Sequence, residues 1–112
     1  MSLQLEKRPV EFRGNRYELV FNNEALDALE TEYGDMKAVM EDSVDHISAA
    51  FFRILLNCAR ADLGEDPLET RDVARETSYA MIRELDIFGG LLRALSPEAA
   101  LKAQKEGASE KN

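Results

Sequence analysis

The side chains that could do chemistry in this sequence are few and scattered. His46 is the only histidine and Cys58 the only cysteine, and no second histidine or thiol lies near either one in the sequence. A zinc site needs about four such ligands, and a catalytic histidine needs an oriented partner. We therefore expect His46 to be a structural or solvated residue and Cys58 to be an inert residue among apolar neighbours.

Carboxylates are abundant, but their arrangement is that of a solvated surface. Glu24, Asp27 and Glu30 share one face of an expected helix, and no segment offers the apolar pocket that would raise the pKa of one of them for acid–base catalysis. Gly89-Gly90 lacks the lysine and the spacing of a phosphate-binding loop, and no stretch matches a calcium-binding loop. The sequence predicts no enzyme, no cofactor and no metal site.

Composition limits the partners and the compartment. The net charge of -8 disfavours binding to nucleic acid, because it repels phosphate backbones. A single cysteine excludes an intrachain disulfide. The most apolar stretch, residues 47–58, is too short and too polar to span a membrane, and the first residues lack the apolar segment of a signal peptide. We expect a cytoplasmic protein without a membrane partner.

The first twenty residues have the alternation of two strands. Tyr17, Leu19 and Phe21 alternate with polar residues, and Val10 and Phe12 share one face of the preceding run. A two-residue loop at Gly14-Asn15 would be of type II′ and would place Phe12 opposite Tyr17. Pro9 indicates an edge position or a strand start, because it has no N–H to donate.

Helical patterns fill the rest of the chain up to residue 104. The sequence predicts an α+β, mainly α fold, with an N-terminal β-hairpin followed by a four- to five-helix bundle in a single domain of residues 1–104. Residues 105–112 are polar and are predicted to be a disordered tail. The expected helices are 24–33, 44–62, 71–85 and 87–95, with a short extra turn at 35–40 and a restart of the helix at Ser96-Pro97.

The helix at 44–62 is apolar around most of its circumference, so it is either the central helix of the fold or part of an oligomer interface. Together with the segment 87–95 it carries more apolar surface than a small hairpin and a few helices would be expected to bury. Large exposed apolar patches mark protein partners. The sequence therefore predicts a protein-binding surface, with self-association as an option, formed by Phe51, Phe52, Leu55, Ile87, Phe88, Leu91, Leu92 and Leu95.

The order of these elements resembles a known family. The stretch from Glu11 to Met40 is similar to the N-terminal pattern of phage tail assembly chaperones, and to the related small protein of prophages and gene-transfer-agent tail clusters. The helix start at Thr70 also resembles that family, and the likeness covers about Val10 to Leu101. In the first stretch the residues that carry the resemblance are Arg16, Tyr17, Leu19, Phe21, Asn23, Ala25, Leu26, Leu29, Glu30 and Gly34.

The resemblance implies a protein that is not an enzyme. Members of the family associate with the tail tape-measure protein, with the tail-tube protein as a second candidate, and are absent from the finished particle. A second hypothesis is a structural tail-tube or connector subunit that stays in the virion, with its hairpin pairing between subunits. A third is a small bacterial regulatory or adaptor domain unrelated to phage.

Overall fold

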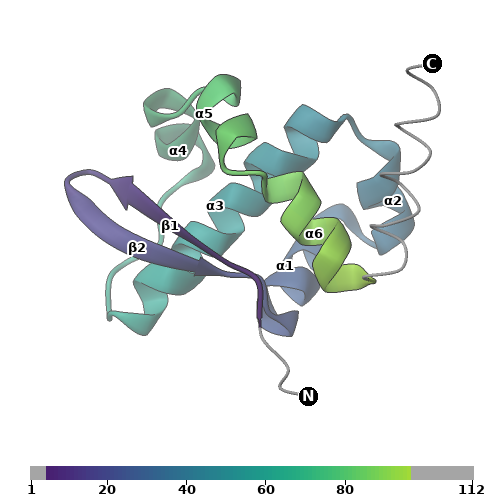
Figure 1. The fold of residues 1–112 in the computed structure, drawn as a ribbon, viewed down its shortest axis with the longest axis horizontal. Helices are drawn as coiled ribbons and strands as arrows, with labels where there is room; N and C mark the ends of the chain where they lie inside the picture. Colours follow the sequence, from purple (N-terminus) through teal and green to yellow (C-terminus); the bar gives the residue numbers. More distant parts are fainter. Residues whose placement is uncertain (1–4, 97–112) are drawn as a thin grey trace.

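The computed structural model describes residues 5–96, which form a hairpin followed by helices (Figure 1). The predicted class, an α+β and mainly α fold with an N-terminal β-hairpin, is confirmed. Ser96 caps the end of α6, and the predicted restart of the helix from Pro97 and the predicted tail at 105–112 lie outside the described residues. The elements are β1 (Lys7–Phe12), β2 (Asn15–Val20), α1 (Asn23–Tyr33), α2 (Met36–Glu41), α3 (Val44–Asp62), α4 (Thr70–Glu76), α5 (Tyr79–Glu84) and α6 (Ile87–Leu95).

The hairpin turns one residue earlier than the sequence pattern predicts. Phe12 pairs with Asn15, and Val10, rather than Phe12, lies opposite Tyr17. The loop is Arg13-Gly14, with φ values of 53° and 78°. Two positive φ angles are the mark of a type I′ loop, whose twist matches that of the strands, so the predicted type II′ loop was wrong. The partner of Phe12 moves by two residues, so the same side chains still face the core.

The first helix follows its local signals. The Asn22 side chain accepts a hydrogen bond from the Ala25 N–H at 3.0 Å, which caps the start of α1. Gly34 has φ of 101° and donates its N–H to the Glu30 carbonyl at 2.8 Å, which ends the helix. The helix predicted at 24–33 therefore agrees with α1 to within one residue.

The predicted helix at 71–85 is two short helices in the structure. The Ser78 side chain caps α5 by accepting from the Met81 N–H at 3.2 Å, and the Thr77 hydroxyl donates to the Val73 carbonyl at 2.7 Å. Thr and Ser side chains compete with the helical hydrogen bonds in this way and end α4. The apolar face expected from Val73 to Leu85 is therefore not continuous, and Met81 lies exposed.

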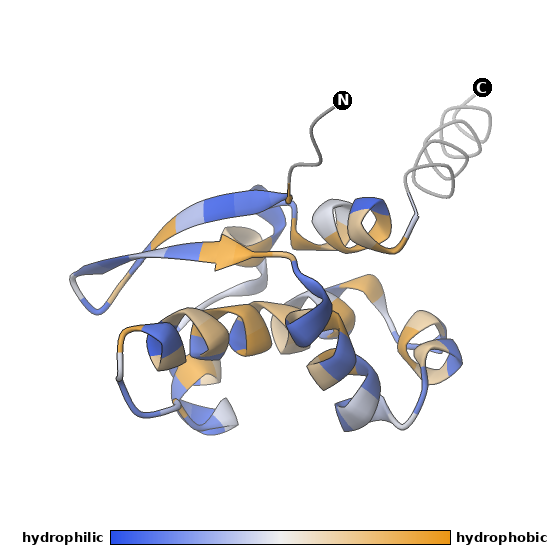
Figure 2. Ribbon diagram, turned by 90° about the horizontal axis from the view of Figure 1, so that it is seen from below, coloured by the Kyte–Doolittle hydropathy of each residue, from blue (hydrophilic) through white to orange (hydrophobic). Residues whose placement is uncertain are grey.

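The long helix α3 is the central helix of the fold. It packs against β2, α1, α4, α5 and α6. Figures 1 and 2 show the hairpin and α6 in one layer on one side of α3, with α1 on the other side. The ring of Phe51 meets the ring of Phe21 edge-on at 5.6 Å between centroids. The apolar circumference of α3 is covered because other elements surround it.

Candidate partner-binding groove

The structure divides the eight residues predicted to bind a partner into two groups. Five of them are buried in the core, and the expectation that they form an exposed surface is corrected: Phe51, Phe52, Leu55, Ile87 and Leu91. Phe88 and Leu92 are half-buried, and Leu95 is 38% exposed. The prediction assumed more apolar surface than the fold could hide, but the hairpin and α6 cover one side of α3 while α1 covers the other.

The orientation of α6 is set by a close contact with the hairpin. A Cβ atom added to Gly90 would lie 2.4 Å from Cε2 of Phe21, so only glycine allows this approach. A glycine inside a helix can permit the close approach of a neighbour, and Gly90 does so here. The contact turns Ile87 and Leu91 inward, which leaves Phe88, Leu92 and Leu95 on the outer part of the helix.

Two of these outer residues, Phe88 and Leu92, line a groove of about 440 Å³ between three helices. Phe88 and Leu92 of α6 form one wall, Ile82 and Arg83 of α5 another, and Val44 and Ser48 at the start of α3 a third. Val44 is 53% exposed, although it stands in the first turn of the central helix. The lining of the groove is mainly apolar, with Arg83, Asp86 and Arg93 as its charged residues, and Val44 is exposed to solvent. An apolar cleft with a few polar groups is a common form of binding site.

Sequence reasoning missed Val44, Ser48, Ile82 and Arg83 as residues of this site. Val44 was counted only as part of the apolar face of the helix. Ile82 was assigned to an inner face that runs through one continuous helix. The groove arises because α5 and α6 both pack on the N-terminal part of α3. No local signal in the sequence reports that packing.

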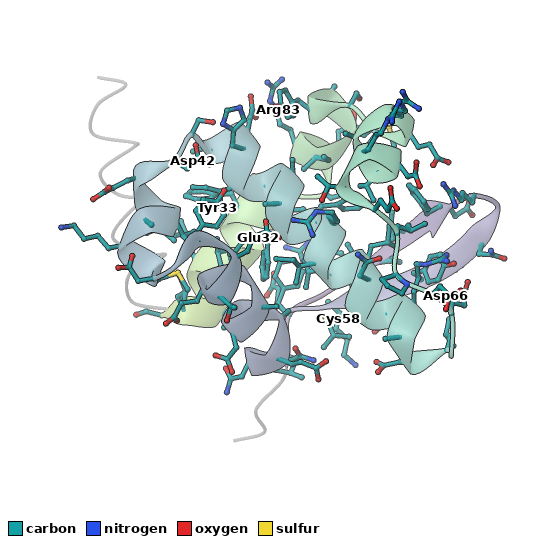
Figure 3. The ribbon with its side chains drawn as sticks, turned by 180° about the vertical axis from the view of Figure 1, so that it is seen from behind. Glu32, Tyr33, Asp42, Cys58, Asp66 and Arg83 are labelled. Carbon is teal, nitrogen blue, oxygen red and sulfur yellow. The ribbon has the colours of Figure 1, made fainter. Side chains whose placement is uncertain are left out.

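Ion pairs fix both sides of the groove. Arg83 of α5 donates from Nε and Nη2 to the Asp45 carboxylate of α3, at 3.0 and 2.7 Å. The guanidinium holds the pKa of Asp45 below its usual value. Figure 3 shows Arg83 on the outside of the molecule. The pair is exposed, so we expect it to orient α5 on α3 more than to stabilise the fold.

A larger charged cluster ties α6 to the start of the hairpin. Arg93 donates from Nη2 to Glu6 at 2.7 Å and to Asp86 at 2.9 Å. Arg8 donates to Glu6 at 2.8 Å and to the Leu85 carbonyl at 2.9 Å. Hydrogen bonds from Arg93, then from Arg8, lower the pKa of Glu6. Asp86, which precedes α6, has a left-handed backbone with φ of 51°. Asp86 and Arg93 themselves line the groove, so this cluster joins the α6 wall to the start of the hairpin.

The candidate reactive residues lie apart from this groove. His46 is exposed, and its Nδ1 lies 3.2 Å from the Asp42 carboxylate, which also accepts a hydrogen bond from the Tyr33 hydroxyl at 2.8 Å. Burial, and then this hydrogen bond, raise the pKa of Tyr33 to about 12. Burial raises the pKa of the Cys58 thiol, which disfavours the nucleophilic thiolate. Figure 3 shows Tyr33 and Asp42 close together and Cys58 well away from them.

Two properties of residues 5–96 bear on the expected chemistry. Between residues 5 and 96, no group of three or more histidine, cysteine, aspartate or glutamate side chains is placed to hold a metal ion. Over the same residues no helix combines the length and apolar character needed to cross a membrane. The absence of an enzyme activity and of a cofactor stays a prediction from the sequence.

Comparisons with protein families, with curated proteins and with solved structures find no match to this chain.

Proposed function

We propose that this protein is a phage or prophage tail assembly chaperone that acts in the cytoplasm and binds the tail tape-measure protein. The observation that carries the proposal is the groove formed by α3, α5 and α6, whose lining is mainly apolar and exposed to solvent at Val44. The stretch from Glu11 to Met40 resembles the tail assembly chaperones, and this resemblance indicates the tape-measure protein as the partner. The tail-tube protein is a second partner under the same proposal.

The physical reason is the nature of the partner. A tape-measure protein is long and helical, with apolar stripes that would aggregate before the tail is assembled. A groove of about 440 Å³ between helices can take apolar side chains from one turn of such a stripe. The net charge of -8 would keep the complex soluble while the stripe is covered.

Co-expression of the chain with its neighbouring tape-measure protein, followed by affinity capture, tests the proposal. Val44→Asp is the most useful variant, because Val44 is exposed and an acidic residue in the first turn of a helix is favourable. We expect it to fold and to lose the tape-measure protein. Met81→Asp is the matched control, since it changes an exposed apolar residue in the first turn of α5 that does not line the groove.

The result for the two variants decides the location and the function separately. If Val44→Asp captures as much tape-measure protein as the unaltered chain does, the groove is not the contact. If the unaltered chain captures none, the chaperone function itself is rejected. Mass spectrometry of finished particles then distinguishes the chaperone from a structural tail-tube or connector subunit, because a chaperone should be absent from them.

A further inference from the structure

The hairpin has two edges, and the register shows which backbone groups each edge presents. The Phe21 N–H donates to the Glu6 carbonyl at 2.9 Å, so this pair is a hydrogen-bonded one. Hydrogen-bonded and non-bonded pairs alternate along an antiparallel ladder. The pairs Lys7–Val20, Pro9–Glu18 and Glu11–Arg16 are therefore the non-bonded ones. Their backbone N–H and C=O groups point away from the hairpin.

The β1 edge is poorly suited to accept another strand. Pro9 stands in the middle of it and has no N–H, so an added strand would lose a hydrogen bond at its centre. The same side of the hairpin is also joined to the helices. Arg13 forms an ion pair with Glu76 of α4, and Arg8 donates to the Leu85 carbonyl after α5. Proline on an edge strand is a common protection against pairing.

The β2 edge is open. Among the described residues, no further hydrogen bond engages the outward N–H or C=O of Arg16 or Glu18, whereas the Val20 carbonyl accepts from Asn22. Figure 2 shows β2 with no helix in front of it, and Figure 1 shows the end of α3 emerging beyond this edge. Leu63, in the turn at that end, is 65% exposed.

The charged side chains on the β2 edge could form ion pairs with those of a second, identical β2 edge. Arg16 and Glu18 both stand on the outer face of β2 and are exposed. Glu18 has only a weak ion pair with Lys7 at 3.6 Å, and Arg16 has none within residues 5–96. We propose that a second copy of this chain pairs with β2 through its own β2, antiparallel about a two-fold axis. Arg16 of each copy then lies opposite Glu18 of the other, and Tyr17 lies opposite Tyr17.

The register and the size of the assembly follow from the same residues. A shift that set Glu18 opposite Glu18 would bring like charges together and is disfavoured. The pairing is isologous, so it closes at two copies and four strands. Both outer edges of that sheet are β1 edges with Pro9, which stops further addition. A head-to-tail ring built from the hairpin would need the β1 edge, so this proposal argues against the ring-forming structural subunit.

Charge reversal on β2 tests the pairing, with size-exclusion chromatography and light scattering as the mass measurement. Arg16→Glu places two acidic pairs in the interface and Glu18→Arg places two basic pairs, so each single variant should be a monomer. Mixing the two variants restores both opposite-charge pairs and should give a heterodimer. The double variant, with Arg16→Glu and Glu18→Arg together, should again dimerise with itself. Glu30→Arg, an exposed change of equal charge on α1, should dimerise like the unaltered chain.

Hydrogen exchange on the unaltered chain gives a second measurement that does not depend on a variant folding. The amides of Arg16 and Glu18 should become protected as the protein concentration rises, whereas those of Lys7 and Glu11 should not. A molecule that stays monomeric up to millimolar concentration overturns the proposal. So does protection of the β2 amides that appears only when a co-expressed tail protein is bound, because the occupant is then a foreign strand.

Discussion

The backbone of Gly90 in α6 lies directly against the ring of Phe21 at the end of β2. A Cβ atom at this position would lie 2.4 Å from the ring, and the ring is itself fixed against Phe51 in the core. This contact fixes how α6 sits on the hairpin, and so which of its side chains reach the groove. The nearest atoms that a Cβ at Gly89, one residue earlier, would meet are those of the Asp86 carboxylate.

The two glycines therefore respond differently to the same substitution. Gly90→Ala should destabilise the fold by about 1–3 kcal/mol, because the core must give way to an added methyl group. Gly89→Ala should fall within about 1 kcal/mol of the unaltered chain, since the Asp86 side chain can move and alanine favours the helix. Urea denaturation of both variants measures the difference. Equal stabilities would mean that the Phe21 contact does not constrain α6.

Asn57 provides a second prediction, because its side chain holds the loop between α3 and α4. Its Oδ1 accepts from the Leu68 N–H at 2.8 Å and its Nδ2 donates to the Leu68 carbonyl at 3.1 Å. Asn57→Ala leaves the N–H and the C=O of Leu68 without this partner. It should lower the free energy of unfolding, measured by urea denaturation, by about 2 kcal/mol. Asn57→Asp should also destabilise, because a carboxylate would face the Leu68 carbonyl. If Asn57→Asp leaves the stability unchanged, the hydrogen bond that Asn57 Nδ2 donates to the Leu68 carbonyl contributes nothing.

The cluster around Glu6 predicts a dependence on pH. The folded-state pKa of Glu6 lies below its ordinary value of 4.5, because Arg93 and Arg8 donate to the carboxylate. The contribution of Glu6 to the free energy of unfolding is therefore fully present above the pKa that Glu6 has in the unfolded chain. It is lost as the pH falls through the lower pKa that Glu6 has in the folded protein. Glu6→Gln should cost about 1 kcal/mol at pH 7, and less as the pH falls below 4.5.

Denaturation curves of the unaltered chain and of Glu6→Gln at several pH values measure this effect. Glu30→Gln is the control, since Glu30 is exposed on α1 and outside the cluster. A difference between the unaltered chain and Glu6→Gln that stays constant from pH 7 to pH 3 would contradict the assignment, because the carboxylate would then not be the titrating group.

Local signals made the hairpin and the first helix predictable. Alternation identified the core-facing residues of both strands, and Asn22 with Gly34 marked the two ends of α1. The loop position was missed because Arg13 takes a positive φ, a conformation that is uncommon for an arginine. The break at Thr77-Ser78 was missed because both residues fitted the apolar–polar period of one continuous helix. At Thr77-Ser78, side-chain hydrogen bonds to the backbone outweighed the helix preference of the segment.

The candidate site was less predictable than the fold. Periodicity identified α6 as apolar, but Ile87, Phe88, Leu91 and Leu92 all belong to that pattern. Which of them face the core depends on the Gly90–Phe21 contact, and which face a groove depends on α5 and Val44. Those relationships join residues that are tens of positions apart. A single sequence shows that the face is apolar but not which neighbour covers it.

The last prediction follows from this division between buried and open residues. From the sequence, Leu55→Asp or Leu91→Asp would be expected to abolish partner binding through a surface contact. Both leucines are 0% exposed, so a buried carboxylate in either position should unfold the protein instead. Even Leu91→Ala should cost about 2–5 kcal/mol, whereas Val44→Ala, in the open wall of the groove, should stay within about 0.5 kcal/mol. Thermal and urea denaturation of these variants measure the contrast directly. If Leu91→Asp keeps a cooperative unfolding transition at an unchanged midpoint, α6 does not dock on α3 as described.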